Sequence, residues 1–240
     1  MADNFKERFS QAVKETETVV YSYLPEETGH QKTIFEAMNY SVKAGGKRLR
    51  PLLMREVYRL FGGNGPEIEP FMAAMEMIHT SSLIHDDLPC MDNDEYRRGK
   101  LTTWKAYGYD MAVLAGDALM IYAFETASKA FSMGADPAKV GRAIGILAEK
   151  TGIYGMIGGQ TVDVELTGKA VPREKLDFIY RLKTGARLHD DRCSPCGRDR
   201  GRDQRGGNDG LRGRSRVPDS GRYPRCDEHS GRAWKAGSER

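Results

Sequence analysis

Fifteen residues, His85 to Gly99, contain the side chains of this chain that are best suited to metal and phosphate chemistry. The segment carries five acids and two arginines, and it directly follows an apolar run. Carboxylate oxygens suit Mg²⁺, which keeps several waters and takes one or two protein carboxylates together with substrate phosphates. Arginine guanidinium groups match phosphate oxygens through paired hydrogen bonds. The segment therefore predicts a magnesium–diphosphate site, whereas an arbitrary acid-rich stretch would favour a solvated loop.

The order of the acids separates candidate metal ligands from solvated residues. Asp86 and Asp87 stand at the expected end of an apolar helix, and Pro89 forces an irregular segment after it. Asp92 then returns to the same end of that helix. We predict Asp86 and Asp92 as metal ligands, with Asp87 close behind, and residues 93–95 as outer or solvated.

A second anion site is indicated upstream, where two glycines precede a basic helix start. Gly45 and Gly46 let the backbone approach a ligand closely. Lys47 and Arg50 follow just before Pro51, at a helix start whose unpaired N–H groups also favour an anion. Spacing alone leaves a basic surface turn equally open.

Five segments occur in an order that matches one known family. They are Gly45–Pro51, His79, Asp86–Gly99, Gly159–Asp163 and Lys183–Gly185. Asp86-Asp87-x₄-Asp92 followed by Arg97-Arg98-Gly99 resembles the first aspartate-rich motif of the trans-prenyl diphosphate synthases (polyprenyl synthetase family) in its bacterial form. The other four segments resemble the family's homoallylic diphosphate clamp, a further ligand to that diphosphate, and two downstream motifs. The resemblance extends over residues 1 to about 186.

This resemblance implies an all-α terpenoid (isoprenoid) synthase helical bundle. The implied enzyme is Mg²⁺-dependent and condenses isopentenyl diphosphate with dimethylallyl, geranyl or farnesyl diphosphate to give farnesyl (C15) or geranylgeranyl (C20) diphosphate. By resemblance, Gly46, Lys47, Arg50, His79 and Arg98 bind the homoallylic diphosphate, Arg97 the allylic one, and Gln160, Lys183 and Thr184 serve the reaction centre and the departing diphosphate. Asp86, Asp87 and Asp92 are implied to bind Mg²⁺, and a homodimer is implied as well.

Product length is predicted from the position five residues before the first motif. Ser81 stands there, with Ser82 next. A large aromatic residue at this position would block elongation at C15, so Ser81 favours a C20 product. Deeper residues could still close the tunnel, which leaves C15 open.

Helical spacing of apolar residues extends through the body of the chain and indicates the elements that carry these motifs. We predict helices at about residues 5–24, 30–43, 52–60, 70–85, 102–117, 121–131, 140–148 and 172–182. Gly155, Gly158 and Gly159 are expected to interrupt a helix before Gln160. The methionine-rich stripe of residues 70–85 predicts core, and by resemblance it also lines the product tunnel.

Composition excludes several other classes. The N-terminus is charged and has no apolar signal segment. No apolar run approaches the roughly 18 residues of a membrane span, so we expect a soluble cytoplasmic protein without a membrane span. Of four cysteines only Cys90 precedes residue 187, which is not a disulfide framework.

Composition changes sharply at Arg187. Residues 187–240 carry 14 basic and 9 acidic residues, whereas residues 1–186 carry 23 and 25. The tail has no Ile, Met or Phe, so we expect it to be disordered. An Arg/Gly nucleic-acid arm or a zinc site from Cys193-x₂-Cys196 and Cys226-x₂-His229 are alternatives to an out-of-frame translation.

The genetic code favours the out-of-frame alternative. Degenerate codons for Val217 to Ser230, read from the second base, permit FQIRDDILDVTS, which resembles the family's second aspartate-rich motif. The same offset permits LGKPV from residue 233 and FTTIAAAPAGEI from Leu188. We therefore infer one surplus base, or two missing, near codons 186 and 187, and we expect no zinc or nucleic-acid binding.

The predicted organisation is an incomplete prenyl synthase helical domain, residues 1–186, followed by a low-complexity tail, residues 187–240. The second metal half-site is then missing, and we expect the chain as written to have little or no activity. A non-catalytic subunit of a two-component prenyl synthase is the alternative, but such subunits generally lack the aspartate motifs.

Overall fold

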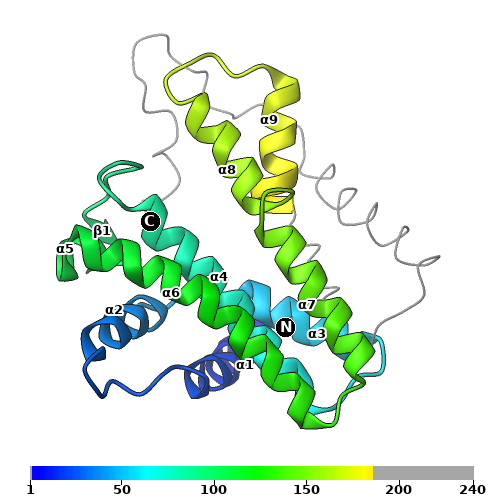
Figure 1. Ribbon diagram of the computed structural model, residues 1–240. Coiled ribbons are helices and arrows are strands. Elements are labelled where there is room, and N and C mark those ends of the chain that lie inside the picture. Colours follow the sequence, from blue (N-terminus) through cyan, green and yellow to red (C-terminus); the bar gives the residue numbers. More distant parts are fainter. Residues whose placement is uncertain (1, 186–240) are drawn as a thin grey trace. The chain divides into compact units, whose positions relative to one another are not determined.

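The computed structural model describes residues 2–185, which divide into two compact units, one reaching Thr151 and one beginning at Gly152 (Figure 1). Each unit is described by itself below. The predicted disordered tail, the zinc pattern and the out-of-frame segments lie outside the described residues.

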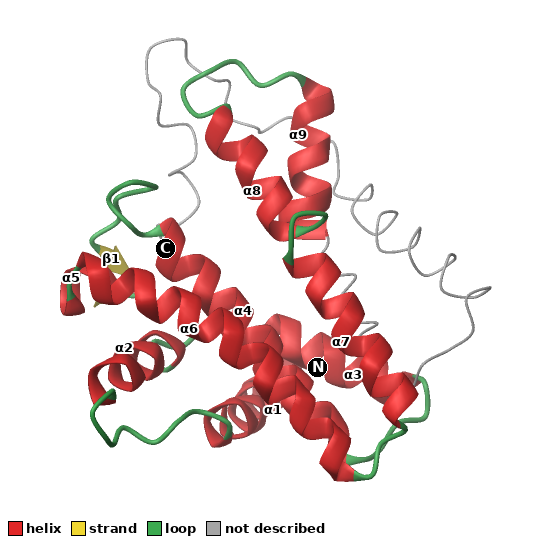
Figure 2. Ribbon diagram, viewed as in Figure 1, coloured by secondary structure: helices red, strands yellow, loops and turns green. Residues whose placement is uncertain are grey.

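Helices make up nearly all of the regular structure, which confirms the all-α prediction (Figure 2). The first unit contains α1 (Ala2–Ser22), α2 (Lys32–Val42), α3 (Leu49–Leu60), η1 (Pro66–Ile68), α4 (Glu69–Asp86), α5 (Thr103–Tyr107), α6 (Tyr109–Ser128), η2 (Lys129–Met133) and α7 (Pro137–Thr151), with the short strands β1 (Tyr96–Arg97) and β2 (Lys100–Leu101). The second contains α8 (Met156–Glu165), α9 (Arg173–Ile179) and the π-helix η3 (Tyr180–Gly185).

Helix α4 is the core of the first unit. Every residue from Pro70 to Ile78 is buried, as the methionine-rich stripe predicted. Helix α6 packs along it and presents small buried residues, among them Ala112, Ala115, Gly116 and Ala123 (Figure 1). Short side chains let the backbones of α6 and α4 approach closely. Helices α1, α2 and α3 also pack against α4. The site residues at the end of α4 are therefore attached to the best-packed element of the unit.

Two predicted helix boundaries were wrong. Residues 109–128 form one unbroken helix, and the chain breaks at Gly108, whose φ is 97°, a left-handed conformation that favours glycine. In the second unit Gly158 and Gly159 lie inside α8 rather than interrupting it. A Cβ on Gly158 would run into the carbonyl oxygen of Ile153, so this glycine serves close packing at the helix start.

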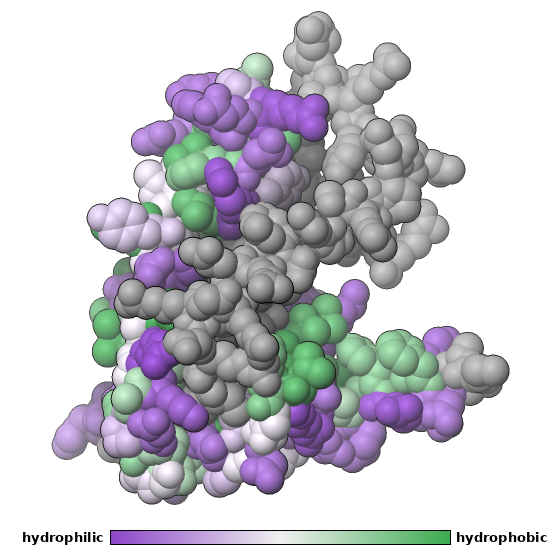
Figure 3. All heavy atoms as spheres, turned by 90° about the vertical axis from the view of Figure 1, so that its right-hand side faces the viewer, coloured by the Kyte–Doolittle hydropathy of each residue, from purple (hydrophilic) through white to green (hydrophobic). Residues whose placement is uncertain are grey.

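Figure 3 shows hydrophilic and apolar side chains interspersed on one face of the described residues.

Among the described residues one helical stretch, Tyr109–Met133, is long and apolar enough to cross a membrane by length and composition alone, which the sequence analysis did not anticipate. Core helices of soluble proteins meet the same criterion, and the α6 part of this stretch packs along α4.

Candidate active site

The acid-rich segment begins where the sequence predicted, at the last residue of α4. Asp86 ends the helix and Asp87 is its C-cap residue. The Asp92 backbone N–H donates to the Asp86 carbonyl oxygen at 2.8 Å, so the loop folds back onto the helix end. The return is possible because Asn93 adopts a left-handed conformation with φ 54°, which asparagine tolerates better than most residues.

The far side of this loop is attached to the start of α5. The Asp94 carbonyl oxygen accepts hydrogen bonds from Thr102 Oγ1 and Trp104 Nε1, both at 2.8 Å. Lys105 Nζ lies 2.7 Å from Glu95 Oε1. Asp94 through its backbone carbonyl and Glu95 through its exposed side chain therefore attach the loop to the start of α5.

Arg97 binds Asp87 across the loop. Its Nε donates to both carboxylate oxygens at 2.7 and 2.9 Å, and its Nη2 lies 2.5 Å from Oδ1. The Asp87 side chain is 5% exposed. Burial raises the pKa of the Asp87 carboxyl, and the Arg97 guanidinium opposes that rise without cancelling it. The pKa of Arg97 is raised in turn by hydrogen bonding to Asp87, although desolvation acts against this as the largest single contribution.

Arg98 connects the acid-rich segment to the upstream basic one. Arg98 and Gly99 form the two-residue turn between β1 and β2, with φ values of 53° and 75°. Two such left-handed residues are typical of a type I′ hairpin turn. From this turn the Arg98 guanidinium donates to the Gly45 carbonyl oxygen. A Cβ on Gly46 would lie 3.0 Å from the same guanidinium, so a glycine is needed there.

Several charged side chains lie around Arg98 at this meeting point. Loss of hydration lowers the pKa of Arg98, Glu76 opposes the change, and the like charges of Arg48, Arg97 and Arg50 lower it further. The side chain stays charged at neutral pH. Lys47 is exposed and forms no ion pair with the part of the chain that the structure describes. The predicted diphosphate ligands of the first unit thus include several cations around one turn.

The predicted metal ligands are not gathered into a metal centre. Among residues 2–185 no group of three His, Cys, Asp or Glu side chains could hold a metal ion. The physical reasons are that Asp87 is occupied by Arg97 and that Asp92 is exposed. The chemical type of the Asp86 and Asp92 side chains nevertheless fits Mg²⁺, because this ion needs only one or two carboxylate ligands beside water and phosphate.

The remaining predicted residues of the first unit lie on α4. His79 and Ser82 are half-buried, and Ser82 Oγ donates to the His79 carbonyl oxygen at 2.8 Å. Ser81 is completely buried, and its hydroxyl has no hydrogen-bond partner within the described residues. Ser81 therefore lies in a packed interior, where a larger side chain would need new space.

Gln160, Lys183 and Thr184 belong to the second unit, on α8 and η3. Lys183 Nζ lies 2.7 Å from Asp163 Oδ2, so two matched motifs meet through an ion pair. A Cβ on Gly159 would lie 2.7 Å from the Lys183 backbone nitrogen, which explains a glycine at this contact between α8 and η3. π-Helical turns often occur at functional sites.

Two features of the site were missed by the sequence analysis. Arg48 is buried with Glu76, although its position in a basic run suggested an exposed cation. His85, which precedes the aspartates predicted to bind metal, lies against Gly116 of α6 and 3.5 Å from Asp117 Oδ1. The sequence signal for the burial of Arg48 was Glu76, an acid inside an apolar helix. The signal for the place of His85 was Gly116, a glycine inside another helix.

An aspartate-terminated core helix thus lies beside an arginine turn and a glycine–lysine segment in a helical protein. The chain matches the family model described as Polyprenyl synthetase over residues 31–193. This is more than half of its length, and the chain belongs to the polyprenyl synthetase family. The prediction made from the five ordered motifs is confirmed.

Similar proteins carry farnesyl or geranylgeranyl synthase names. The geranylgeranyl pyrophosphate synthase, chloroplastic, of Capsicum annuum is 50% identical over 156 residues, covering 65% of this chain and 42% of that protein. The farnesyl diphosphate synthase of Geobacillus stearothermophilus is 43% identical over 189 residues, covering 78% and 63%. The chain thus spans less than two thirds of the length of these relatives.

A solved structure supports the fold. The crystal structure of an FPP/GFPP synthase from Zymomonas mobilis superposes with a TM-score of 0.78 at 37% sequence identity. The match covers 88% of this chain and 79% of that one. The terpenoid synthase type of helical fold, predicted from the motifs, is therefore confirmed.

Proposed function

We propose that this chain derives from a prenyltransferase that condenses isopentenyl diphosphate with an allylic diphosphate to give farnesyl or geranylgeranyl diphosphate. The observation that carries the proposal is the meeting of two distant segments, in which Arg98 donates to the Gly45 carbonyl oxygen beside Lys47. Such a cluster of guanidinium, ammonium and backbone groups suits a diphosphate. The names of the relatives supply the class of substrate.

In this proposal Lys47, Arg50, His79 and Arg98 hold the diphosphate of isopentenyl diphosphate. Arg97 faces the diphosphate of the allylic substrate, where fixed positive charge stabilises the leaving group. The allylic C–O bond breaks and its electron pair leaves with diphosphate. The double bond of isopentenyl diphosphate supplies the electrons of the new C–C bond, and a proton is lost to the departing diphosphate.

The carboxylates of Asp86 and Asp92 would hold Mg²⁺ in this proposal, together with that of Asp87 if it leaves Arg97. The ion would supply further positive charge to the diphosphate oxygens. Ser81 favours a C20 product in this proposal, with C15 as the alternative.

We further propose that the reading frame changes near codon 187. The family match ends at residue 193, close to the change in composition. The chain as written then lacks the second aspartate-rich motif and turns over little or no substrate.

We propose that the intact protein is a cytoplasmic homodimer and that it has no role in nucleic-acid binding.

The test uses the 240-residue chain and a second chain in which the frame is restored near codon 187. Both are incubated with labelled isopentenyl diphosphate, geranyl diphosphate and Mg²⁺, and the products are separated by chain length. We expect C15 or C20 product from the restored chain, abolished by a chelator, and binding of isopentenyl diphosphate with little turnover from the 240-residue chain. A restored, folded chain without product would refute the proposed activity, and full turnover by the 240-residue chain would refute the proposed impairment.

A further inference from the structure

Arg48 stands in the middle of the basic segment but does not face solvent. The residue is only 2% exposed, whereas its neighbour Lys47 is exposed. Arg48 is the N-cap residue of α3 and has a φ of 48°, a left-handed conformation that residues other than glycine seldom adopt. Something must hold this backbone conformation in place.

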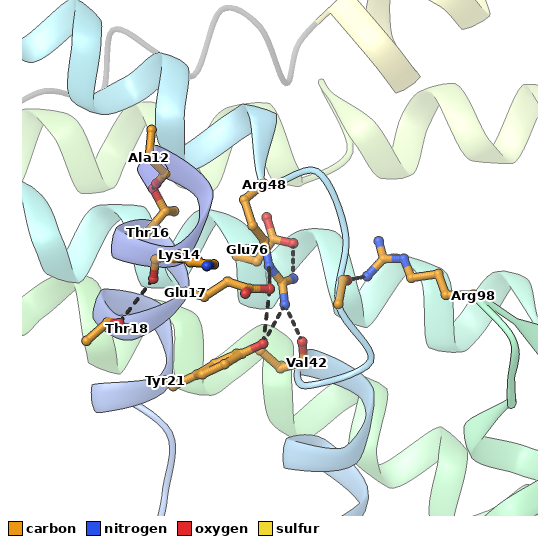
Figure 4. A network of polar contacts seen from close by, with 11 residues as sticks. Ala12, Lys14, Thr16, Glu17, Thr18, Tyr21, Val42, Arg48, Glu76 and Arg98 are labelled. Atoms are coloured by element: carbon orange, nitrogen blue, oxygen red, sulfur yellow. Dashed lines mark hydrogen bonds and ion pairs between the residues drawn. The ribbon is translucent and has the colours of Figure 1, made fainter. Parts of the chain in front are cut away.

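The Arg48 guanidinium binds groups from three helices (Figure 4). Nη1 donates to Glu76 Oε1 of α4 at 2.6 Å, and Nε donates to Glu17 Oε1 of α1 at 3.2 Å. Nη2 donates to the Tyr21 hydroxyl at 3.1 Å and to the Val42 carbonyl oxygen, at the end of α2, at 2.7 Å. Only a planar fork with several N–H groups can serve such a set of acceptors.

The same segment forms the backbone of the candidate diphosphate site. Gly45 and Gly46 have φ values of 88° and 142°, so the turn between α2 and α3 contains three residues with positive φ, Arg48 included. Arg48 holds this turn at its end, and Arg98 holds it at Gly45. Figure 4 labels both arginines. Lys47 lies between the two attachments.

We propose that Arg48 is a positioning residue for diphosphate binding, which acts without touching the ligand. Its buried network fixes the turn so that Lys47 and Arg50 stand beside Arg98. This inference rests on the proposed function, since it names a residue that prepares the same diphosphate site.

The first test compares R48K with a matched control, R55Q, in the 240-residue chain. Arg55 also lies on α3 and is 12% exposed at its side chain, and its ion-pair partners are Glu15 of α1 at 3.3 Å and Glu56 of α3 at 3.4 Å rather than groups of the turn. Binding of isopentenyl diphosphate is measured by calorimetry, and amide hydrogen exchange is measured for residues 43–49. We expect R48K to weaken binding by about tenfold to a hundredfold and to accelerate exchange in the turn, and we expect R55Q to do neither.

A second test separates positioning from simple stability. The double variant R48M/E76L replaces the buried ion pair with apolar groups, a change that often keeps or raises stability. We expect its resistance to urea to recover relative to R48M while its affinity for isopentenyl diphosphate stays low. Recovery of affinity together with stability would overturn the proposal, because Arg48 would then be structural only.

The outcomes separate the two proposals. A parent chain that binds isopentenyl diphosphate while R48K binds it equally well refutes the positioning role alone. A parent chain that binds no isopentenyl diphosphate refutes the proposed diphosphate site, and the positioning role falls with it.

Discussion

Replacing Gly116 with alanine tests how tightly α6 packs against the end of α4. An added Cβ would lie within 2.8 Å of three atoms of the His85 ring. Favourable carbon contacts are about 3.5–4.0 Å long, so the ring or the helix must move by roughly 1 Å. Overpacking of a core costs about 1–3 kcal/mol, and the lower end of this range is expected here because the His85 side chain is 32% exposed and its ring can turn.

Alanine also has an advantage that must be separated from this cost. In a helix interior it is more favourable than glycine by about 1 kcal/mol. Gly145 supplies the matched control, because it lies in α7 and a Cβ there meets nothing within 4 Å. We expect the free energy of unfolding of G145A to rise by up to about 1 kcal/mol. That of G116A should lie about 1–3 kcal/mol below that of G145A.

Urea denaturation of both variants measures this difference. The double variant H85A/G116A adds a further check, since removing the ring should relieve the clash and restore part of the loss relative to G116A. Equal stabilities of G116A and G145A would refute the close contact. A double variant less stable than G116A by the full cost of H85A would show that the two residues do not interact.

Three further predictions concern single side chains. S81A should leave the free energy of unfolding unchanged or raise it by about 1 kcal/mol, because the buried hydroxyl has no partner among the described residues; a clear loss in urea denaturation would show that it has one. Burial raises the pKa of Asp87 above its unfolded value of about 3.9, so its contribution to stability is greatest below that value and falls as pH rises through the folded pKa. The unfolding free energy of the wild type relative to D87N should therefore decrease from acid to neutral pH, and an increase would mean that Arg97 lowers that pKa. K47Q should weaken binding of isopentenyl diphosphate by about tenfold or more yet change stability by at most about 0.5 kcal/mol, whereas R97Q should also lower stability, because Arg97 binds a buried carboxylate; calorimetry and urea denaturation separate the two cases.

The helix that carries the site was predictable because its signals are local. An apolar run with one acid inside it, Glu76, is followed by Asp86, Asp87 and Pro89. This pattern predicts both a buried helix and its end, and α4 ends at Asp86. The break at Gly108 was missed because the sequence does not distinguish a glycine with positive φ from one inside a helix. Gly116 and Gly158 lie in helices, where their role is close packing.

The pairing of charges was less accessible to sequence reasoning. Asp87 was predicted beside a metal ion, and the structure gives it an arginine instead. Arg48 and Glu76 are 28 positions apart, and only the packing of α3 and α4 shows that they meet. Burial of a charge depends on tertiary contacts, which neither helical spacing nor a basic run in the sequence reports.

The basic side chains of Arg48, Arg97, Arg98 and Lys47 divide into two kinds, and this division follows from what each one binds. Arg48 is neutralised by Glu76 and Glu17, and Arg97 by Asp87, so both charges contribute to holding the fold. Arg98 donates to a backbone carbonyl, and Lys47 forms no ion pair within residues 2–185, so their charges are not cancelled by a direct carboxylate partner. In the proposed site a dianion therefore binds at Lys47 and Arg98 without first breaking an ion pair. Arg97 contacts Asp87 through Nε and Nη2, and neither contact uses its Nη1 group, so a dianion can share this arginine with Asp87. If binding instead separates Arg97 from Asp87, the released carboxylate becomes available to a cation that arrives with the diphosphate, and this exchange of partners would couple the arginine and aspartate halves of the motif.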